Sequence, residues 1–142
     1  MKTVQQLLES KRHGIASVSP ATTVLDALRL MAEKEIGAVL VIEADALVGI
    51  FSERDYARKV VLQGKASKDT PVREIMTERV VSVRPDQTIE DCMGLMTDKR
   101  IRHLPVLQGR RVVGVISIGD VVKEMLVEKE FVIQQLESYI HN

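Results

Sequence analysis

The stretches GIFSERD at residues 49–55 and GVISIGD at residues 114–120 decide the fold of this chain, because they are two copies of one pattern. Each has a glycine, two apolar residues, a serine, two variable residues and an aspartate. The copies lie 65 positions apart, and the same offset superposes residues 17–55 on residues 82–120 without a gap. Such a duplication predicts two similar supersecondary units that share a core, since neither unit alone can bury its apolar face.

Within each copy, the hydrophobic spacing predicts a strand, a helix, two strands and a second helix. Apolar residues recur with helical spacing between Val24 and Met31, and residues 38–42 form an almost continuous apolar run typical of a strand buried on both faces. The leading strands are predicted at residues 15–18 and 80–83. This order predicts a mixed α/β (α+β) fold of two β-α-β-β-α repeats, with small sheets flanked by helices.

The boundary between the repeats is predicted in residues 63–71, which are rich in small, polar and helix-breaking residues and show no periodicity. We therefore expect a first repeat over residues 1–69, with its core at 15–62. The second repeat is expected over residues 70–142, with its core at 80–127.

From Asp120 onward, the chain is predicted to form one long helix that outruns what a single repeat needs. Apolar side chains trace a stripe along it, made of Val121, Val122, Met125, Leu126, Val132, Ile133, Leu136 and Ile140. A stripe of this length needs a partner surface. We expect part of it to pack on a second copy of the chain, giving a homodimer.

Composition disfavours several kinds of partner. The formal net charge is zero and aromatic residues make up 3% of the chain, so neither a basic patch nor a base-stacking surface for nucleic acid is expected. No apolar run approaches the roughly 18 residues that span a membrane, and the amino terminus lacks secretory or transit character. We therefore expect a cytoplasmic protein with no nucleic-acid or membrane partner.

The chain offers little for catalysis. Its one cysteine, Cys92, stands where the first copy has Ala27, which favours a buried small apolar residue over a redox role. No cluster of metal ligands is apparent, and no nucleophile stands beside a candidate base. The glycines match neither a P-loop nor a dinucleotide-binding motif. These absences favour a protein that is not an enzyme.

The repeated serine and aspartate carry the chemistry of the pattern. At Ser52 and Asp55, and again at Ser117 and Asp120, a strand runs into a helix, with hydroxyl and carboxylate three residues apart in the first turn. Such a pair is close to a capping box, which needs no ligand. A carboxylate that faces a cleft also suits a vicinal diol such as ribose, because it can accept from two hydroxyls at once. The spacing alone leaves both interpretations open.

Two tandem copies of this pattern, a proline after each leading strand, and the segment Arg102-His103-Leu104-Pro105-Val106 resemble a pair of cystathionine β-synthase (CBS) domains, or Bateman module. The resemblance covers essentially the whole chain and is to the small stand-alone CBS-pair proteins of bacteria and plant organelles. It implies two repeats related by a pseudo-twofold axis, with two clefts and no catalytic cofactor. In this family the clefts bind AMP, ADP or ATP, and sometimes NAD or S-adenosylmethionine.

The resemblance also implies a function, that of a homodimeric sensor of energy or redox state that modulates an unidentified effector protein in trans. The alternative is a ligand-free assembly scaffold. In that case the serine and aspartate only cap helices, and the long final helix is the working surface.

Carried over residue by residue, the resemblance assigns Asp55 and Asp120 to the ribose hydroxyls. Ser52 and Ser117 would then lie near the ribose or the α-phosphate. The leading strands would read the edge of the adenine, through Ile15, Ser17 and Val18 in the first copy and Val80 and Ser82 in the second.

Arg102 and His103, three and two positions before Pro105, match the family's phosphate-contacting pair, and the resemblance places Pro105 in the same binding site. The first copy has glycine and alanine at the corresponding residues 37–38 and so departs from the pattern. The resemblance therefore implies asymmetric basic contacts, and the two clefts are expected to differ in affinity or in ligand. Arg54, in the first turn of its helix, is placed to compensate in part.

Overall fold

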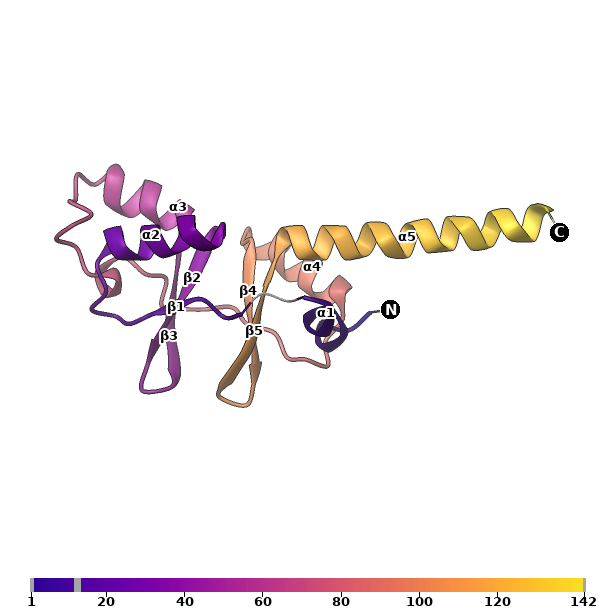
Figure 1. The fold of residues 1–142 in the computed structure, drawn as a ribbon, viewed down its shortest axis with the longest axis horizontal. Helices are drawn as coiled ribbons and strands as arrows, with labels where there is room; N and C mark the ends of the chain where they lie inside the picture. Colours follow the sequence, from indigo (N-terminus) through magenta and orange to yellow (C-terminus); the bar gives the residue numbers. More distant parts are fainter. Residues whose placement is uncertain (1, 12–13, 142) are drawn as a thin grey trace.

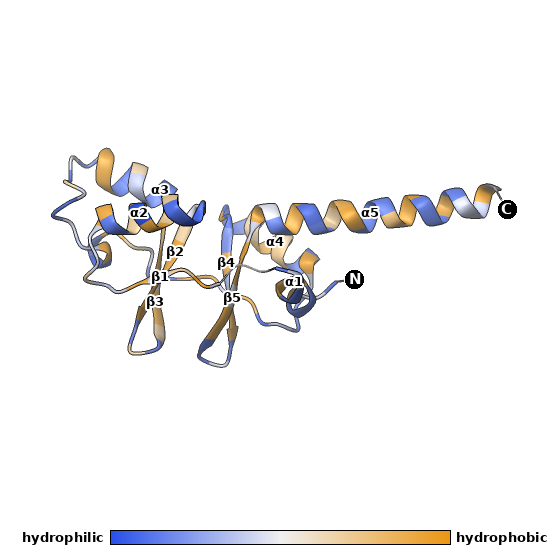
Figure 2. Ribbon diagram, in the orientation of Figure 1, coloured by the Kyte–Doolittle hydropathy of each residue, from blue (hydrophilic) through white to orange (hydrophobic). Residues whose placement is uncertain are grey.

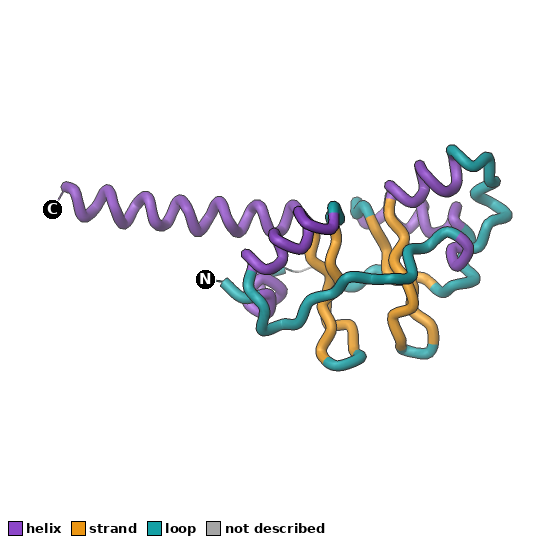
Figure 3. The backbone as a smooth tube through the Cα atoms, turned by 180° about the vertical axis from the view of Figure 1, so that it is seen from behind, coloured by secondary structure: helices purple, strands orange, loops and turns teal. Residues whose placement is uncertain are grey.

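The computed structural model describes residues 2–11 and 14–141, and it places two small sheets side by side at the centre of the molecule (Figure 1). Strands β3 and β5, one from each sheet, are in contact. The long helix α5 projects away from the body at one end (Figures 1 and 3). The predicted mixed α/β architecture, with small sheets, flanking helices and a long carboxyl-terminal helix, is confirmed.

The first repeat forms a three-stranded sheet in the order β1-β2-β3, with β1 parallel and β3 antiparallel to β2. A threonine or serine side chain caps each of its two α-helices, α2 and α3, so the helices begin where the sequence signals predict. Its elements are β1 (Ser17–Val18), α2 (Val24–Lys34), β2 (Ala38–Glu43), β3 (Ala46–Ser52), α3 (Glu53–Asp55) and the π-helical turn η1 (Tyr56–Val61).

The second repeat forms a two-stranded antiparallel sheet of β4 and β5, whose register repeats that of β2 and β3. A short helical segment precedes each repeat. The elements are α1 (Val4–Ser10) at the amino terminus, then the 3₁₀ turn η2 (Val72–Glu74), α4 (Ile89–Lys99), β4 (His103–Gln108), β5 (Arg111–Ser117) and α5 (Ile118–His141).

The leading strand predicted for the second repeat at residues 80–83 is wrong, because only one parallel bridge forms there, at Val83. In the first repeat, the Leu40 N–H donates to the Ala16 carbonyl oxygen at 3.1 Å and extends the ladder. Pro105 occupies the position that corresponds to Leu40 and has no N–H to donate. The pairing therefore ends one bond earlier, and β1 has no full counterpart.

The segment before each repeat packs in the core of the other repeat; we call these two segments, which contain α1 and η2, the leading segments. Val4 and Leu7 of α1 belong to the apolar cluster of the second repeat, whereas Val72 and Ile75 belong to that of the first. Figures 1 and 3 show α1 beside α4, far from the sheet that follows it in the sequence. Each half of the chain thus completes the core of the other, which ties the two repeats together.

Glycines on the third strand of each pattern make these exchanges possible. A Cβ at Gly49 would lie 2.5 Å from the Met76 sulfur, and a Cβ at Gly114 would lie 2.6 Å from Leu8 Cδ2. Any side chain at either position would collide with the exchanged segment. The glycine of the duplicated pattern therefore serves close packing between the repeats.

Helix α5 alternates apolar and polar side chains along its whole length (Figure 2). Beyond the body its large apolar residues are exposed, and Phe131, Val132, Ile133 and Leu136 are each more than half accessible. Over the residues that the structure describes, no helix combines the length and apolar character needed to cross a bilayer. The stripe predicted from the sequence is thus present, and its far end is exposed in the part of the chain that the structure describes.

Candidate functional site

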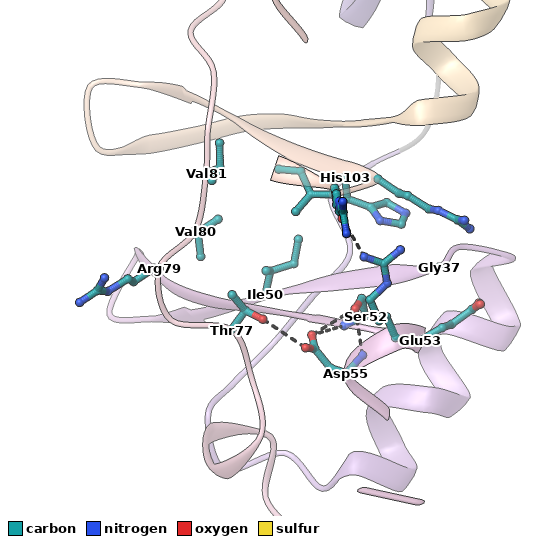
Figure 4. Close-up of a pocket in the computed structure, with 14 residues that line it drawn as sticks. Gly37, Ile50, Ser52, Glu53, Asp55, Thr77, Arg79, Val80, Val81 and His103 are labelled. Atoms are coloured by element: carbon teal, nitrogen blue, oxygen red, sulfur yellow. Dashed lines mark hydrogen bonds between the residues drawn. The ribbon is translucent and has the colours of Figure 1, made fainter. Parts of the chain in front are cut away.

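A cavity of about 330 Å³ lies between the two repeats, at the start of α3 (Figure 4). This volume is within the range of small-molecule sites, which is roughly 300–1,000 Å³. The first repeat contributes Gly37, Ile50, Ser52, Glu53, Arg54 and Asp55, and the second contributes Thr77, Arg79, Val80, Val81, Arg100, Ile101, Arg102 and His103.

The Asp55 carboxylate lines this cavity and is only 8% exposed. Its Oδ2 accepts from the Ser52 N–H at 3.0 Å and from the Ser52 hydroxyl at 3.1 Å. The Asp55 N–H in turn donates to Ser52 Oγ at 3.2 Å, which completes a capping box. The capping box that the sequence allows is therefore present, and its hydrogen bonds fix the Asp55 carboxylate at the N-terminus of α3.

The second oxygen of Asp55 faces the other repeat. Oδ1 accepts from the Thr77 hydroxyl at 3.1 Å and lies 3.1 Å from the Lys59 ammonium, which is exposed on the next helical turn. Figure 4 shows Thr77 reaching Asp55 from the opposite side to Ser52. A carboxylate has about four acceptor positions, so Asp55 joins both repeats while hydroxyl and ammonium donors, which can rotate away, cover Oδ1.

Basic residues line the same cavity. The Arg54 guanidinium donates to the Arg100 carbonyl oxygen at 2.7 Å and so spans the two repeats. His103 lies against Gly37, where a Cβ would come within 3.3 Å of the ring. Arg102 precedes it on the approach to β4. The guanidinium groups of Arg54 and Arg102 give the cavity positive charge suited to an anion, and the Glu53 carboxylate lines it as well.

Burial lowers the pKa of His103 below its ordinary value, and the positive charge of Lys11 lowers it further. Glu53 and Asp120 act in the opposite direction but do not outweigh these effects. These effects favour the neutral imidazole, which can both donate and accept a hydrogen bond.

The remaining wall of the cavity is apolar. Ile50 lies between Asp55 and the segment of the second repeat that carries Val80 and Val81 (Figure 4). A flat apolar ring fits such a wall, with polar groups at its edges to orient it. The site thus combines a buried carboxylate, an apolar surface and cations.

The second repeat carries the same serine and aspartate in a different environment. Asp120 Oδ2 accepts from the Ser117 N–H at 2.9 Å and from the Lys11 ammonium at 2.7 Å. The same ammonium donates to the Val115 carbonyl oxygen at 2.7 Å. Burial alone would raise the pKa of Asp120, but the bonds from Lys11 and Ser117 lower it below its usual range.

The structure brings together about half of the residues that the sequence analysis assigned to a site. Those lining the cavity are Ser52, Arg54, Asp55, Val80, Arg102 and His103. Those that do not line it are Ile15, Ser17, Val18, Ser82, Pro105, Ser117 and Asp120. Arg102 and His103 thus share the cavity of Asp55, and Arg54 adds to their charge instead of replacing it.

Thr77, Arg79 and Arg100 also line the cavity, although the sequence analysis did not assign them to it. Thr77 and Arg79 lie outside the duplicated pattern, and nothing in the local sequence marks them as facing Asp55. Among the residues with a described placement, no three His, Cys, Asp or Glu side chains gather as a metal site would require.

The fold and this inter-repeat cavity define a paired-repeat binding module. The family profile of the CBS domain matches residues 8–62 and 72–127. The chain therefore belongs to the CBS domain family and carries two CBS domains in tandem.

Relatives and solved structures agree with this assignment. The chain is 44% identical over 123 residues to the mitochondrial CBS domain-containing protein CBSX3 of Arabidopsis thaliana, covering 83% of this chain and 60% of the relative. It therefore spans about three fifths of that relative's length. A putative signal-transduction protein with CBS domains from Burkholderia ambifaria superposes with a TM-score of 0.86 at 52% identity, covering 89% of this chain and 95% of the other.

A more distant structure shares the fold. The CBS domain pair of protein MJ0100, solved in complex with 5′-methylthioadenosine and S-adenosyl-L-methionine, superposes with a TM-score of 0.80 at 22% identity. The alignment covers 90% of this chain and 98% of that one. CBS pairs are regulatory modules, and this chain has the architecture of one.

Proposed function

We propose that this protein is a regulatory module that binds an adenosine-containing ligand (AMP, ADP, ATP or NAD) in the cavity between its repeats. The observation that carries the proposal is the buried Asp55 carboxylate, fixed by the capping box and open on Oδ1 to donors that can rotate away. Ribose hydroxyls would replace the Thr77 and Lys59 donors at that oxygen. The CBS domain pair of MJ0100 supports the proposal, since it has this fold and was solved in complex with two adenosine compounds.

The other walls of the cavity accommodate the rest of such a ligand. The apolar surface of Ile50, Val80 and Val81 would receive the adenine ring. The cations Arg54 and Arg102 would receive the phosphates, with neutral His103 donating a hydrogen bond. Each part of an adenine nucleotide thus has a wall of matching chemistry.

Both repeats would contact the ligand, so binding would change how they pack on each other. A ligand shifts such an equilibrium only by its differential affinity for the two arrangements. The bonds that cross the boundary, from Thr77 to Asp55 and from Arg54 to Arg100, are the contacts that differ when a ligand displaces them. We propose that an effector protein reads this change in trans and that the chain itself is not an enzyme.

We further propose that the exposed apolar stripe of α5 packs on a second copy, and that the homodimer resides in the cytoplasm. Exposed patches of this size on a helix are typical of interaction surfaces. Sedimentation of the whole chain and of a Leu136→Asp variant would test the dimer, which the charge should dissociate.

A ligand-free scaffold is the second candidate, because the capping boxes satisfy both aspartates without a ligand. A thermal-shift screen with AMP, ADP, ATP, NAD and S-adenosylmethionine separates the two. A ligand at about 100 times its Kd should raise the Tm by roughly 5–10 °C, whereas a scaffold should show no shift with any compound.

A further inference from the structure

The two helix-start carboxylates are met by different donors from the exchanged leading segments. At Asp55 the donor is the Thr77 hydroxyl, 3.1 Å from Oδ1. At Asp120 it is the Lys11 ammonium, 2.7 Å from Oδ2. A neutral group that can turn away therefore faces one carboxylate, and a full positive charge occupies the other.

Lys11 also repeats the backbone contact of Thr77. The Thr77 N–H donates to the Ile50 carbonyl oxygen at 2.8 Å, and the Lys11 ammonium donates to the carbonyl oxygen of the corresponding Val115 at 2.7 Å. The Lys11 ammonium thus contacts the strand carbonyl of the second repeat that corresponds to the carbonyl contacted by the Thr77 backbone in the first. The side chain is only 19% exposed, so it is packed against the end of β5 and the start of α5 and does not project into solvent.

The position of Lys11 is fixed by α1. Lys11 is the C-cap residue of that helix, and its N–H donates to the carbonyl oxygens of Leu7 and Leu8. At the other end of α1, the Lys2 ammonium pairs with Glu124 of α5 at 2.7 Å. Two lysines therefore bracket α1 on α5, but only Lys11 reaches a helix-start carboxylate.

Among the described residues, the duplication does not repeat three cations of the first cavity. The positions that correspond to Arg102 and His103 are Gly37 and Ala38, and the position that corresponds to Arg54 is Gly119. Lys11, bound to Asp120, therefore replaces a neutral donor at the second carboxylate, whereas the arginines belong to the first cavity.

We propose that Lys11 acts as a tethered cation that closes the second cleft, so that each chain binds one adenosine ligand, at Asp55, and a second only after Lys11 leaves Asp120. This inference rests on the proposed function. Because an ammonium held by two acceptors must be displaced, we expect the second cleft of the wild-type protein to bind at least about tenfold more weakly than the first.

Calorimetric titration with AMP and ATP tests the inference on four proteins: wild type, Lys11→Met, Asp120→Asn and the control Lys2→Met. Methionine keeps the apolar stem of the lysine and removes the charge. The control removes an ion pair of the same length between the same segment and α5, but outside the cleft. Lys11→Gln, which also removes the charge, replaces Lys11→Met if that variant does not fold.

The expected result is one tight site per chain in the wild type and in Lys2→Met, with any second site at least about tenfold weaker, and two sites of comparable affinity in Lys11→Met. Asp120→Asn should bind at the first site within about twofold of the wild type. Two sites of equal affinity in the wild type, or weaker first-site binding in Asp120→Asn, would overturn the inference and leave the proposed function standing. Lys11→Met with one site only would also overturn it. No binding by any of the four proteins would overturn the proposed function, and this inference with it.

Discussion

Thr77 donates its hydroxyl to Asp55 at 3.1 Å across the boundary between the two CBS domains. The carboxylate that caps helix α3 of one domain is thereby held by the segment that opens the other. Any ligand that binds Asp55 must contact or displace a bond between the domains. The ligand recognition that we propose and the relative packing of the domains would therefore be coupled at one buried oxygen.

Replacing Thr77 by valine should remove this bond while keeping the volume of the side chain. A hydrogen bond to a charged group contributes about 1.5–3 kcal/mol, and Lys59 retains part of the interaction at the same oxygen. We expect the free energy of unfolding in urea to fall by about 1–2 kcal/mol. Thr77→Ser, which keeps the hydroxyl, is the matched control. Equal stabilities for the valine and serine variants would show that the bond contributes nothing.

Gly49→Ala should destabilise the protein because its Cβ would meet the Met76 side chain and approach the Thr77 carbonyl oxygen at 3.1 Å. Overpacking of this kind costs about 1–3 kcal/mol. Shortening the opposing side chain with Met76→Ala should reduce the cost of the glycine substitution, giving a favourable coupling energy in a double-mutant cycle.

Gly94→Ala is the control for the Gly49→Ala substitution. Gly94 lies in α4, and a Cβ there would meet no atom within 4 Å. Alanine should therefore stabilise this helix by about 0.5–1 kcal/mol. If both glycine substitutions change the free energy of unfolding in the same direction, Gly49 is not required for close packing against Met76.

Cys92 should be inert in the folded protein. It is fully buried in the second core, and burial raises the pKa of its thiol to about 11, with Asp91 and Glu90 adding to the effect. Only the thiolate reacts readily, so a maleimide or disulfide reagent at pH 8 should label it only in urea. Rapid labelling of the native protein would contradict both its burial and its assignment as a core residue.

The pKa of His103 should be low in the free protein and should rise when a phosphate binds. Its pKa lies below 6.5 in the folded protein, so the imidazole contributes stability at neutral pH that is lost as the pH falls from about 6.5 through the folded pKa. A bound phosphate would favour the charged form and raise that pKa. Proton NMR titration of the ring, assigned with His103→Gln, should show a pKa below 6.5 without ligand and a higher one with AMP. An unchanged pKa on saturation would place the phosphate elsewhere.

Much of the fold could be predicted from the sequence, because duplicated turns, caps and apolar runs are local signals. The helix starts at Ser52 and Ser117 and the long final helix follow from such signals. The loss of the second leading strand is also local, since Pro105 removes one ladder donor, yet it is visible only when the copies are compared strand by strand.

The composition of the site could not be predicted in the same way. Arg102 and His103 line the same cavity as Asp55 of the other repeat, and this depends on how the two sheets face each other. Lys11 lies in a leading segment that the duplication does not align, and α1 reaches the second core only through tertiary packing. Periodicity indicates that a face is buried but not which core covers it.

The central claim is that the Asp55 carboxylate binds the adjacent hydroxyls of a ribose. The most direct measurement is a calorimetric titration of the wild type and of Asp55→Asn with the nucleotide that gives the largest thermal shift, and with its 2′-deoxy analogue. We predict that the asparagine variant binds roughly 10–150 times more weakly and that the wild type prefers the ribonucleotide. Equal affinity of both proteins for both compounds, with both proteins folded, would contradict the claim.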